Sequence, residues 1–98
     1  MIMMEVRVPT SYTEAIKLIN DSGKGGEIRW GFYSKKPNVM TERMYGMYSP
    51  IAYVYENDEL KYAAHFKHNK VMAYDPLDNL VELSDEQNTL IEEKIKSA

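Results

Sequence analysis

The sequence predicts a single α+β domain, in which a small, curled and mostly antiparallel β-sheet or barrel carries two or three short helices. Ile51–Tyr55 and Leu60–Phe66 are rich in β-branched and aromatic residues and flank the turn-forming segment Glu56–Glu59, which is typical of a β-hairpin. A bare hairpin is only marginally stable in water, so its apolar face needs cover. Two helical patterns that start after Ser11 and Ser84 can supply this cover.

Length and composition limit the class of protein. The 98 residues are enough for one domain, 1–98, with one modest core. The chain has no cysteine, which excludes disulfides, thiolate metal sites and cysteine nucleophiles. Its first residues, MIMMEVRV, lack the features of a signal peptide, and no run is long enough to span a bilayer. We therefore expect a cytoplasmic protein with no membrane partner.

The charge is unevenly distributed along the chain. The net charge is −3, but residues 75–98 hold seven acids and two lysines, and residues 1–74 hold eight acids and ten lysines and arginines. The low isoelectric point therefore belongs to the C-terminal tail. The weakly basic body is compatible with a nucleic-acid partner and does not by itself indicate one.

The first two elements are a strand and a helix. Ile2–Val8 alternates between apolar and polar residues, which predicts a half-buried strand that ends at Pro9. Ser11 and Glu14 form a predicted capping box, in which each side chain accepts the other residue's backbone N–H. The helix that follows has an apolar stripe made of Tyr12, Ala15, Ile16 and Ile19.

The middle of the chain is harder to interpret. Glu27–Ser34 reads as a second strand, with Ile28, Trp30 and Phe32 on one face and a gap at Gly31 where a backbone or a flat ligand can approach. Val39–Tyr48 is either a loop or a short helix. In the helical case Val39, Met40, Arg43, Met44 and Met47 line the helix, and Gly46 and Pro50 keep it short.

A two-residue loop at Asn57-Asp58 sets the expected register of the hairpin. Tyr55 then faces Leu60, and Tyr53 faces Tyr62. One face of the hairpin carries Ile51, Tyr53, Tyr55, Leu60, Tyr62 and Phe66, and the other carries Ala52, Val54, Lys61, Ala63 and His65.

The C-terminal third ends in a second capped helix. Val71–Tyr74 continues the hairpin or adds a strand, and Leu80–Leu83 is a short extended segment. A capping box at Ser84 opens a helix to about Lys96. This helix turns Leu90, Ile91 and Ile95 inward and carries an i, i+4 pair between Glu92 and Lys96.

The sequence contains no recognisable catalytic or metal-binding pattern. His65 and His68 would point to opposite faces of a strand, and a metal site needs further convergent ligands. Gly23–Gly26 lacks the residue order of a phosphate-binding loop. Ser34 and Ser49 lie in no nucleophile motif. We therefore predict no catalytic residues, no metal site, no cofactor and no enzymatic activity.

Aromatic residues are the chief excess in this chain. Nine of them lie between Trp30 and Phe66. They can fill the core of a curled sheet, or a few of them can form an open cage for a nucleobase, since bases stack on aromatic rings. Five basic residues near these strands can contact phosphates or can simply be solvated: Lys35, Lys36, Arg43, Lys67 and Lys70.

The order of these elements resembles the EVE branch of the PUA-like superfamily. The similar features are a helix with E-A-I, a glycine-containing loop, the strand I-R-W-G-F, and the hairpin I-A-Y-V-Y-E-N-D-E-L-K-Y-A-A-H-F, within about Thr13–Tyr74. The chain departs from the family at Tyr48-Ser49-Pro50, where members usually have G-D before the first hairpin strand.

The resemblance implies a small β-barrel with a pocket for a flipped, often modified base of DNA or RNA, as in modification-dependent restriction systems. Trp30, Tyr48 and Tyr53 would be the walls of the cage, and Ser49 would hydrogen-bond an edge of the base. The resemblance also raises the expectation that the domain is the N-terminal module of a longer chain.

A different class of function fits the same composition. Seven methionines and eight tyrosines suit an exposed protein-binding surface, because both residue types are enriched at interfaces. The alternative expectation is a small phage-type interaction protein that binds and inhibits a host defence complex.

Overall fold

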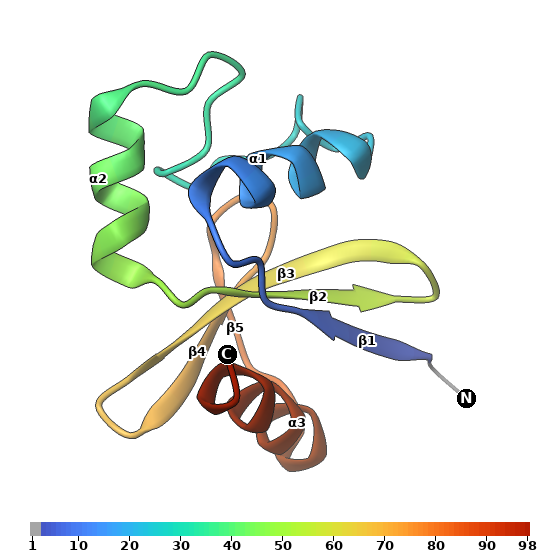
Figure 1. Cartoon of the computed structure of the whole chain (residues 1–98). Helices are drawn as coiled ribbons and strands as arrows, with labels where there is room; N and C mark the ends of the chain where they lie inside the picture. Colours follow the sequence, from blue (N-terminus) through green and yellow to red (C-terminus); the bar gives the residue numbers. More distant parts are fainter. Residues whose placement is uncertain (1–2) are drawn as a thin grey trace.

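Five antiparallel strands form one sheet, in the order β1-β2-β3-β4-β5, in the computed structural model, which describes residues 3–98 (Figure 1). The three helices confirm the predicted α+β class. The first and last strands lie on opposite edges, so the described sheet is open. The elements are β1 Met4–Arg7, α1 Tyr12–Asp21, α2 Val39–Tyr48, β2 Ala52–Glu56, β3 Glu59–Lys67, β4 Lys70–Tyr74, β5 Leu80–Val81 and α3 Asp85–Lys96.

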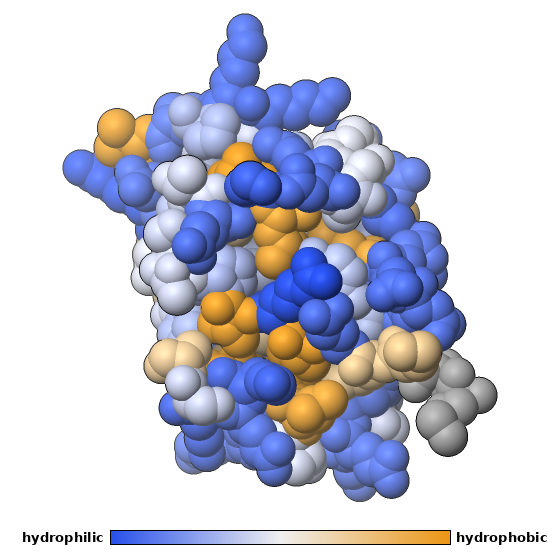
Figure 2. Space-filling model, turned by 45° about the vertical axis from the view of Figure 1, so that its right-hand side comes forward, coloured by the Kyte–Doolittle hydropathy of each residue, from blue (hydrophilic) through white to orange (hydrophobic). Residues whose placement is uncertain are grey.

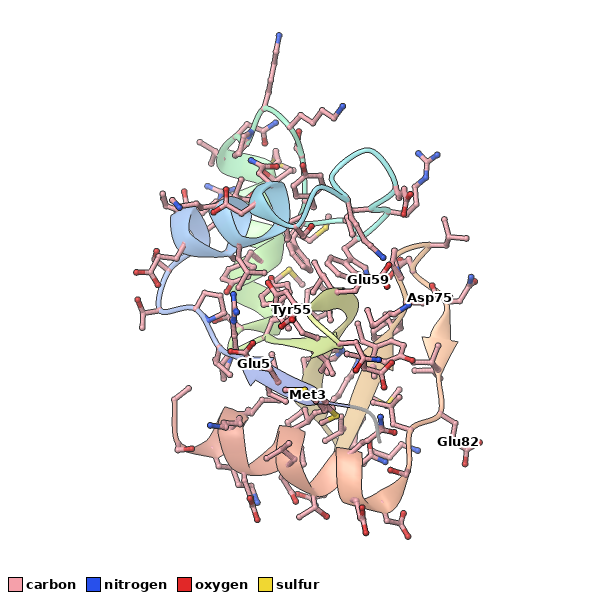
Figure 3. All side chains as sticks on the ribbon, turned by 90° about the vertical axis from the view of Figure 1, so that its right-hand side faces the viewer. Met3, Glu5, Tyr55, Glu59, Asp75 and Glu82 are labelled. Carbon is pink, nitrogen blue, oxygen red and sulfur yellow. The ribbon has the colours of Figure 1, made fainter. Side chains whose placement is uncertain are left out.

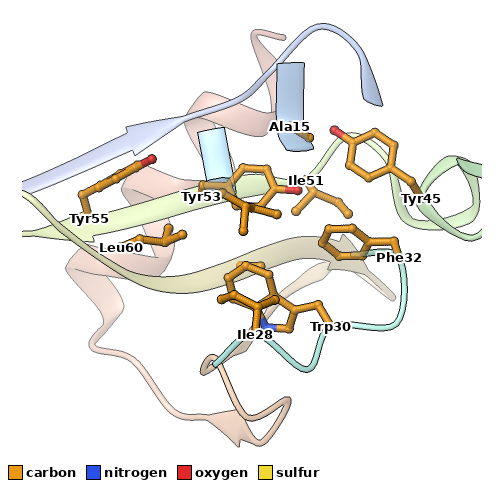
Figure 4. Close-up of a cluster of buried hydrophobic side chains, with 11 residues drawn as sticks. Ala15, Ile28, Trp30, Phe32, Tyr45, Ile51, Tyr53, Tyr55 and Leu60 are labelled. Carbon is orange, nitrogen blue, oxygen red and sulfur yellow. The ribbon is translucent and has the colours of Figure 1, made fainter. Parts of the chain in front are cut away.

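The sheet separates two apolar cores. Figure 3 shows α1 and α3 on opposite sides of the strands. The core on the α1 side also takes in the connection between α1 and α2, and the core on the α3 side holds Ile91 and Ile95. The buried side chains of the first core are Ala15, Ile19, Ile28, Trp30, Phe32, Tyr45, Ile51, Tyr53, Tyr55, Leu60 and Ala63 (Figure 4).

Two tight turns hold the middle strands together. Asn57 and Asp58 join β2 to β3 with φ angles of 52° and 64°. His68 and Asn69 join β3 to β4 with φ angles of 52° and 63°. Two consecutive residues with positive φ give a two-residue loop that matches the twist of the strands. The predicted hairpin and the β4 strand are therefore confirmed.

The register of the hairpin differs from the prediction because β3 contains a bulge. Tyr55 does face Leu60, but the next residue of β2, Val54, faces Tyr62, so Lys61 is an extra residue on β3. One extra residue moves every later side chain to the other face. Tyr62 and Phe66 therefore pack in the core beside α3, and Ala63 lies on the α1 side.

The predicted strand Glu27–Ser34 is wrong, although its burial pattern is right. The segment is irregular and turns at Gly31, where the Tyr33 N–H donates to the Trp30 carbonyl oxygen at 2.9 Å. Its alternation still sends Ile28, Trp30 and Phe32 into the core. The alternation therefore predicted which side chains are buried. These three side chains hold the segment in place, and its backbone does not pair with a strand of the sheet.

The helical alternative for Val39–Tyr48 is confirmed, but the residues predicted to line the helix are not the buried ones. Tyr45 is the buried side chain of α2, at 5% exposure. Met40 and Met47 are 68% and 79% exposed. The helix is therefore fixed by one aromatic anchor and leaves its methionines at the surface.

The helix caps follow the sequence with one exception. The Ser84 and Gln87 capping box forms as predicted, and Glu92 pairs with Lys96 at 3.3 Å. At α1, Ser11 accepts from the Glu14 N–H, but the Glu14 carboxylate accepts from the Thr10 backbone and hydroxyl. The predicted first strand is confirmed from Met4 to Arg7, and Ile2 lies outside the described residues.

Candidate functional site: an aromatic pocket beside α2

A pocket of about 320 Å³ opens between the C-terminal half of α2, the turn at Gly31 and the middle of the sheet. This volume lies at the lower end of the range that holds small ligands. Its apolar lining includes Met44, Ile51, Ala63 and Ala64. Five rings complete the walls: Trp30, Phe32, Tyr48, His65 and Tyr74. We call this site the aromatic pocket.

The rings of the aromatic pocket are held by one another. The imidazole of His65 lies parallel to the Tyr74 ring, with centroids 5.9 Å apart and planes 6° apart. Tyr48 meets His65 edge-on at 5.3 Å. Trp30 and Phe32, which line the same pocket, stack with centroids 6.0 Å apart. The site therefore presents several flat surfaces whose positions are set by neighbouring rings.

A hydrogen bond and burial in the core hold the Trp30 side chain in place. Its Nε1–H donates to the carbonyl oxygen of Asp75 at 2.8 Å, and the side chain is 3% exposed. Gly31 permits the close approach of α2, because a Cβ atom at this position would lie 2.7 Å from the Met44 sulfur. The gap that the sequence predicted at Gly31 is therefore occupied by a side chain of the protein itself.

The polar side chains that line the aromatic pocket are Tyr48, His65, Tyr74 and Asp78, and no lysine or arginine is among them. Burial, and to a smaller degree the charge of Lys67, lower the pKa of His65 below its usual value, so the imidazole is neutral at pH 7. Asp78 is exposed at the mouth, with φ of 68°. The polar groups of the lining residues are therefore two tyrosine hydroxyls, a neutral imidazole and a carboxylate.

The loop that carries Asp78 is well braced. The Asp75 carboxylate accepts from the backbone N–H groups of Leu77 and Asn79 at 3.0 and 2.8 Å. The Asp78 N–H donates to the Asp75 carbonyl oxygen at 2.9 Å. The same carbonyl oxygen accepts from the indole N–H of Trp30. Asp75 therefore holds both the loop that carries Asp78 and one aromatic wall of the pocket.

Only part of the predicted cage comes together. Tyr48, 42% exposed, and one surface of the buried Trp30 line the aromatic pocket. Tyr53 is fully buried in the core, and Ser49 is exposed after the end of α2; neither lines the pocket. An open cage that includes Tyr53 is therefore wrong. The Tyr53 ring packs in the core on the α1 side, with its centroid 6.0 Å from that of Trp30 and 6.5 Å from that of Phe32.

The residues that replace them were not predicted as site residues. His65 was assigned to the other face of the hairpin, and the bulge at Lys61 brings it to this one. Tyr74 and Asp78 come from β4 and the following loop, and no local motif marks them. The signal that can find them is spatial, because they join the site only through strand pairing.

The five basic residues do not form one patch. Lys35 and Lys36 lie on the loop before α2, and Arg43 lies on α2. Lys67 and Lys70 flank the β3–β4 turn. In Figure 1 this loop, the helix and this turn follow one another along the side of the molecule that carries α2. All five side chains are exposed, and none of them lines the pocket.

The exposed face of α2 is the second unusual feature. Eight large apolar side chains are exposed among residues 3–98, and five of them lie on this helix. Met40, Met44, Met47 and Tyr48 follow the i, i+4, i+7, i+8 spacing of one helix face. We call these four residues the α2 stripe. Met44 and Tyr48 also line the aromatic pocket, so the two features are continuous.

Other surfaces of the molecule are more mixed. On the face shown in Figure 2, apolar side chains form separate patches bordered by hydrophilic ones. Within residues 3–98 no three His, Asp or Glu side chains converge as a metal site, and no helix is long and apolar enough to cross a bilayer.

Comparisons with protein-family models, with curated proteins and with solved structures found no match.

Proposed function

We propose that this protein is a PUA/EVE-like nucleic-acid-binding module that holds an extruded, methylated base in the aromatic pocket. The observation that carries the proposal is the set of aromatic walls around a space of about 320 Å³. Flat rings stabilise a nucleobase by stacking, and each stacked base is worth roughly 1–3 kcal/mol. This gain can offset the cost of taking the base out of its duplex.

The lining between the rings supports a methylated ligand. The Met44 sulfur and the side chains of Ile51 and Ala63 are apolar and border the same space. A methyl group on the base would exchange water for these contacts, which is favourable. The neutral imidazole of His65 can then donate to, or accept from, the edge of the ring.

The position of the cations supports a backbone that passes the pocket. Lys35 and Lys36 lie before α2, and Lys67 and Lys70 lie at the β3–β4 turn. Phosphates on either side of an extruded base could meet these two groups. These contacts would position the nucleic-acid strand, and the residues of the pocket would recognise the base.

The decisive experiment is a titration with single-stranded oligonucleotides that carry one methylated or one unmethylated base. Trp30 is the only tryptophan of the chain and lines the pocket, so its fluorescence should change when a base stacks nearby. Tyr48→Ala and His65→Ala should weaken binding by roughly 1–3 kcal/mol. Met47→Ala is the matched control, since Met47 is 79% exposed on α2 and does not line the pocket.

Thermal unfolding of each variant checks that the fold is kept. If the variants unfold as the unchanged protein does and no oligonucleotide alters Trp30 fluorescence or gives heat in calorimetry, the base-binding proposal is wrong.

A second function, binding of another protein, is favoured by the α2 stripe. A soluble domain rarely exposes a continuous row of large apolar side chains without a use for it. Methionine adapts to partner surfaces of different shape, and tyrosine is an efficient anchor. The phage-type inhibitor of a host defence complex, expected from the composition, would use this face.

Variants separate the two functions. Met40→Ser with Met47→Ser changes the stripe without touching the pocket lining. His65→Ala changes the pocket without touching the stripe. Affinity purification with the double serine variant should lose a protein partner that the His65→Ala variant retains. Loss of the partner with His65→Ala alone would contradict a role for the stripe.

A further inference from the structure

The aromatic pocket has an asymmetric polar edge. Its lining contains one carboxylate, Asp78, and no lysine or arginine. The side chain of Asp78 has no hydrogen bond or ion pair with other residues of the 3–98 range. Its backbone is nevertheless fixed by the Asp75 turn. The lining therefore contains one carboxylate acceptor without a partner, on a backbone that is fixed, in a site with aromatic walls.

The chemistry of this edge distinguishes two kinds of base. A carboxylate accepts hydrogen bonds and donates none. An exocyclic amine, as in cytosine or adenine, donates to it. A carbonyl oxygen at the same ring position, as in uracil or hypoxanthine, would face it with lone pairs on both sides. The second arrangement desolvates two acceptors without forming a bond, which costs free energy.

We infer that Asp78 makes the aromatic pocket selective for amino bases over their keto counterparts. This inference rests on the proposed function and adds the class of base and the residue that reads it. The aromatic walls supply stacking that tolerates every base, because every base has a π-face. An amino base and its keto counterpart have rings of the same size and differ in their polar edges, and Asp78 is the only charged side chain of the lining.

Selection of an amino base is compatible with methylation. A methyl group on a ring carbon leaves both amine hydrogens, and a single methyl group on the amine leaves one. Asp78 therefore keeps a donor in either case. The methyl group itself can be placed against Met44 and Ile51, which line the pocket without charge.

The test uses short single strands in which every position except the central one is abasic. The central base is cytosine or uracil in one pair and adenine or hypoxanthine in the other. Each pair exchanges an amine for a carbonyl oxygen and, at the neighbouring ring nitrogen, an acceptor for an N–H. We expect the amino base to bind about tenfold more tightly, the effect of one hydrogen bond to a charged group. Binding is followed by Trp30 fluorescence and by calorimetry.

Asp78→Asn is the informative variant, because an amide can both donate and accept and should reduce the preference to about threefold or less. Asp58→Asn is its matched control: Asp58 is also exposed and has a positive φ of 64°, but lies in the β2–β3 turn and does not line the pocket. Asp58→Asn should leave the preference unchanged. Asparagine adopts positive φ readily, so both variants should fold.

The outcomes separate the two proposals. If no strand binds, the pocket takes no base, and the proposed function fails together with the inference. If strands bind and His65→Ala weakens them, but amino and keto bases bind equally or the preference survives Asp78→Asn, the inference is overturned and the proposed function stands. A preference for the keto base also overturns it.

Discussion

The indole nitrogen of Trp30 lies 2.8 Å from the carbonyl oxygen of Asp75, 45 residues further along the chain. This hydrogen bond joins the turn at Gly31 to the loop after β4, and the indole itself is buried. Trp30 therefore has two roles in the structure, since it belongs to the core and also lines the aromatic pocket.

Replacement of Trp30 should consequently destabilise the fold. Trp30→Ala removes a large buried ring, and we expect a loss of roughly 3–5 kcal/mol in the free energy of unfolding. Trp30→Phe keeps an aromatic ring but loses the hydrogen bond, so its loss should be smaller. Urea unfolding of both variants measures the difference. An alanine variant as stable as the unchanged protein would mean that the ring is not buried in solution.

Two core tyrosines carry hydroxyl groups without a protein partner. The hydroxyl oxygens of Tyr45 and Tyr53 are buried and accept or donate no hydrogen bond within residues 3–98 (Figure 4). Burial raises the pKa of both hydroxyls, most strongly that of Tyr53. An unsatisfied buried polar group costs roughly 1–3 kcal/mol.

Removal of these hydroxyls should therefore be harmless or favourable. We expect Tyr53→Phe, and the double change with Tyr45→Phe, to keep or raise the midpoint of thermal unfolding. Tyr12→Phe is a control in the opposite sense, because the Tyr12 hydroxyl donates to the Phe32 carbonyl oxygen at 2.7 Å. A marked loss of stability in Tyr53→Phe would show that its hydroxyl is satisfied in solution.

His65 should make the fold sensitive to mild acid. Its pKa is lowered in the folded protein by burial and by Lys67, whereas in the unfolded chain it stays near about 6.5. Below this pH the unfolded state binds more protons than the folded state does. The contribution of His65 to the free energy of unfolding is therefore fully present above about pH 6.5, and it falls as the pH decreases toward the lowered pKa of the folded state.

Unfolding midpoints at about pH 7.5 and about pH 5.5 measure this effect. His65→Gln should lose less stability between the two values than the unchanged protein does, and His68→Asn, in the exposed β3–β4 turn, should behave like the unchanged protein. Equal losses in the unchanged protein and His65→Gln would contradict the prediction.

The salt dependence of nucleic-acid binding tests whether the lysines before α2 contact phosphates. If Lys35 and Lys36 contact phosphates, Lys35→Ala with Lys36→Ala should weaken binding of all sequences alike. The slope of log affinity against log salt should become shallower by about 1.4–1.8 for two lost contacts. Lys17→Ala with Lys94→Ala, on α1 and α3, is the control. An unchanged slope would mean that Lys35 and Lys36 are only solvated.

Local patterns were enough to predict most of the regular elements. The hairpin, the capped helix from Ser84 and the burial of Ile28, Trp30 and Phe32 follow from residue type and spacing, which act over a few neighbouring residues. The same alternation misled the assignment of Glu27–Ser34, because a period of two records which side chains are buried and does not record which backbone groups pair.

The candidate site was less predictable for a physical reason. Tyr48 was identified from its own helix, but His65, Tyr74 and Asp78 reach the pocket only through the register of β3 and β4. The bulge that sets this register sits at Lys61, where neither glycine nor proline marks it. The spacing of the α2 methionines fits a buried face and an exposed face equally well, so it does not predict their exposure.

Because of the bulge at Lys61, the effect of an insertion or deletion in β3 depends on whether the number of residues gained or lost is odd or even. Deletion of Lys61 would direct Tyr62, Ala64 and Phe66 toward α1 and would turn Ala63 and His65 toward α3. Removal of two residues from the same strand would preserve the facing of every later side chain. Natural variants of this domain should therefore gain or lose residues in β3 in pairs, whereas the connection between α1 and α2, outside the ladder, can change by single residues.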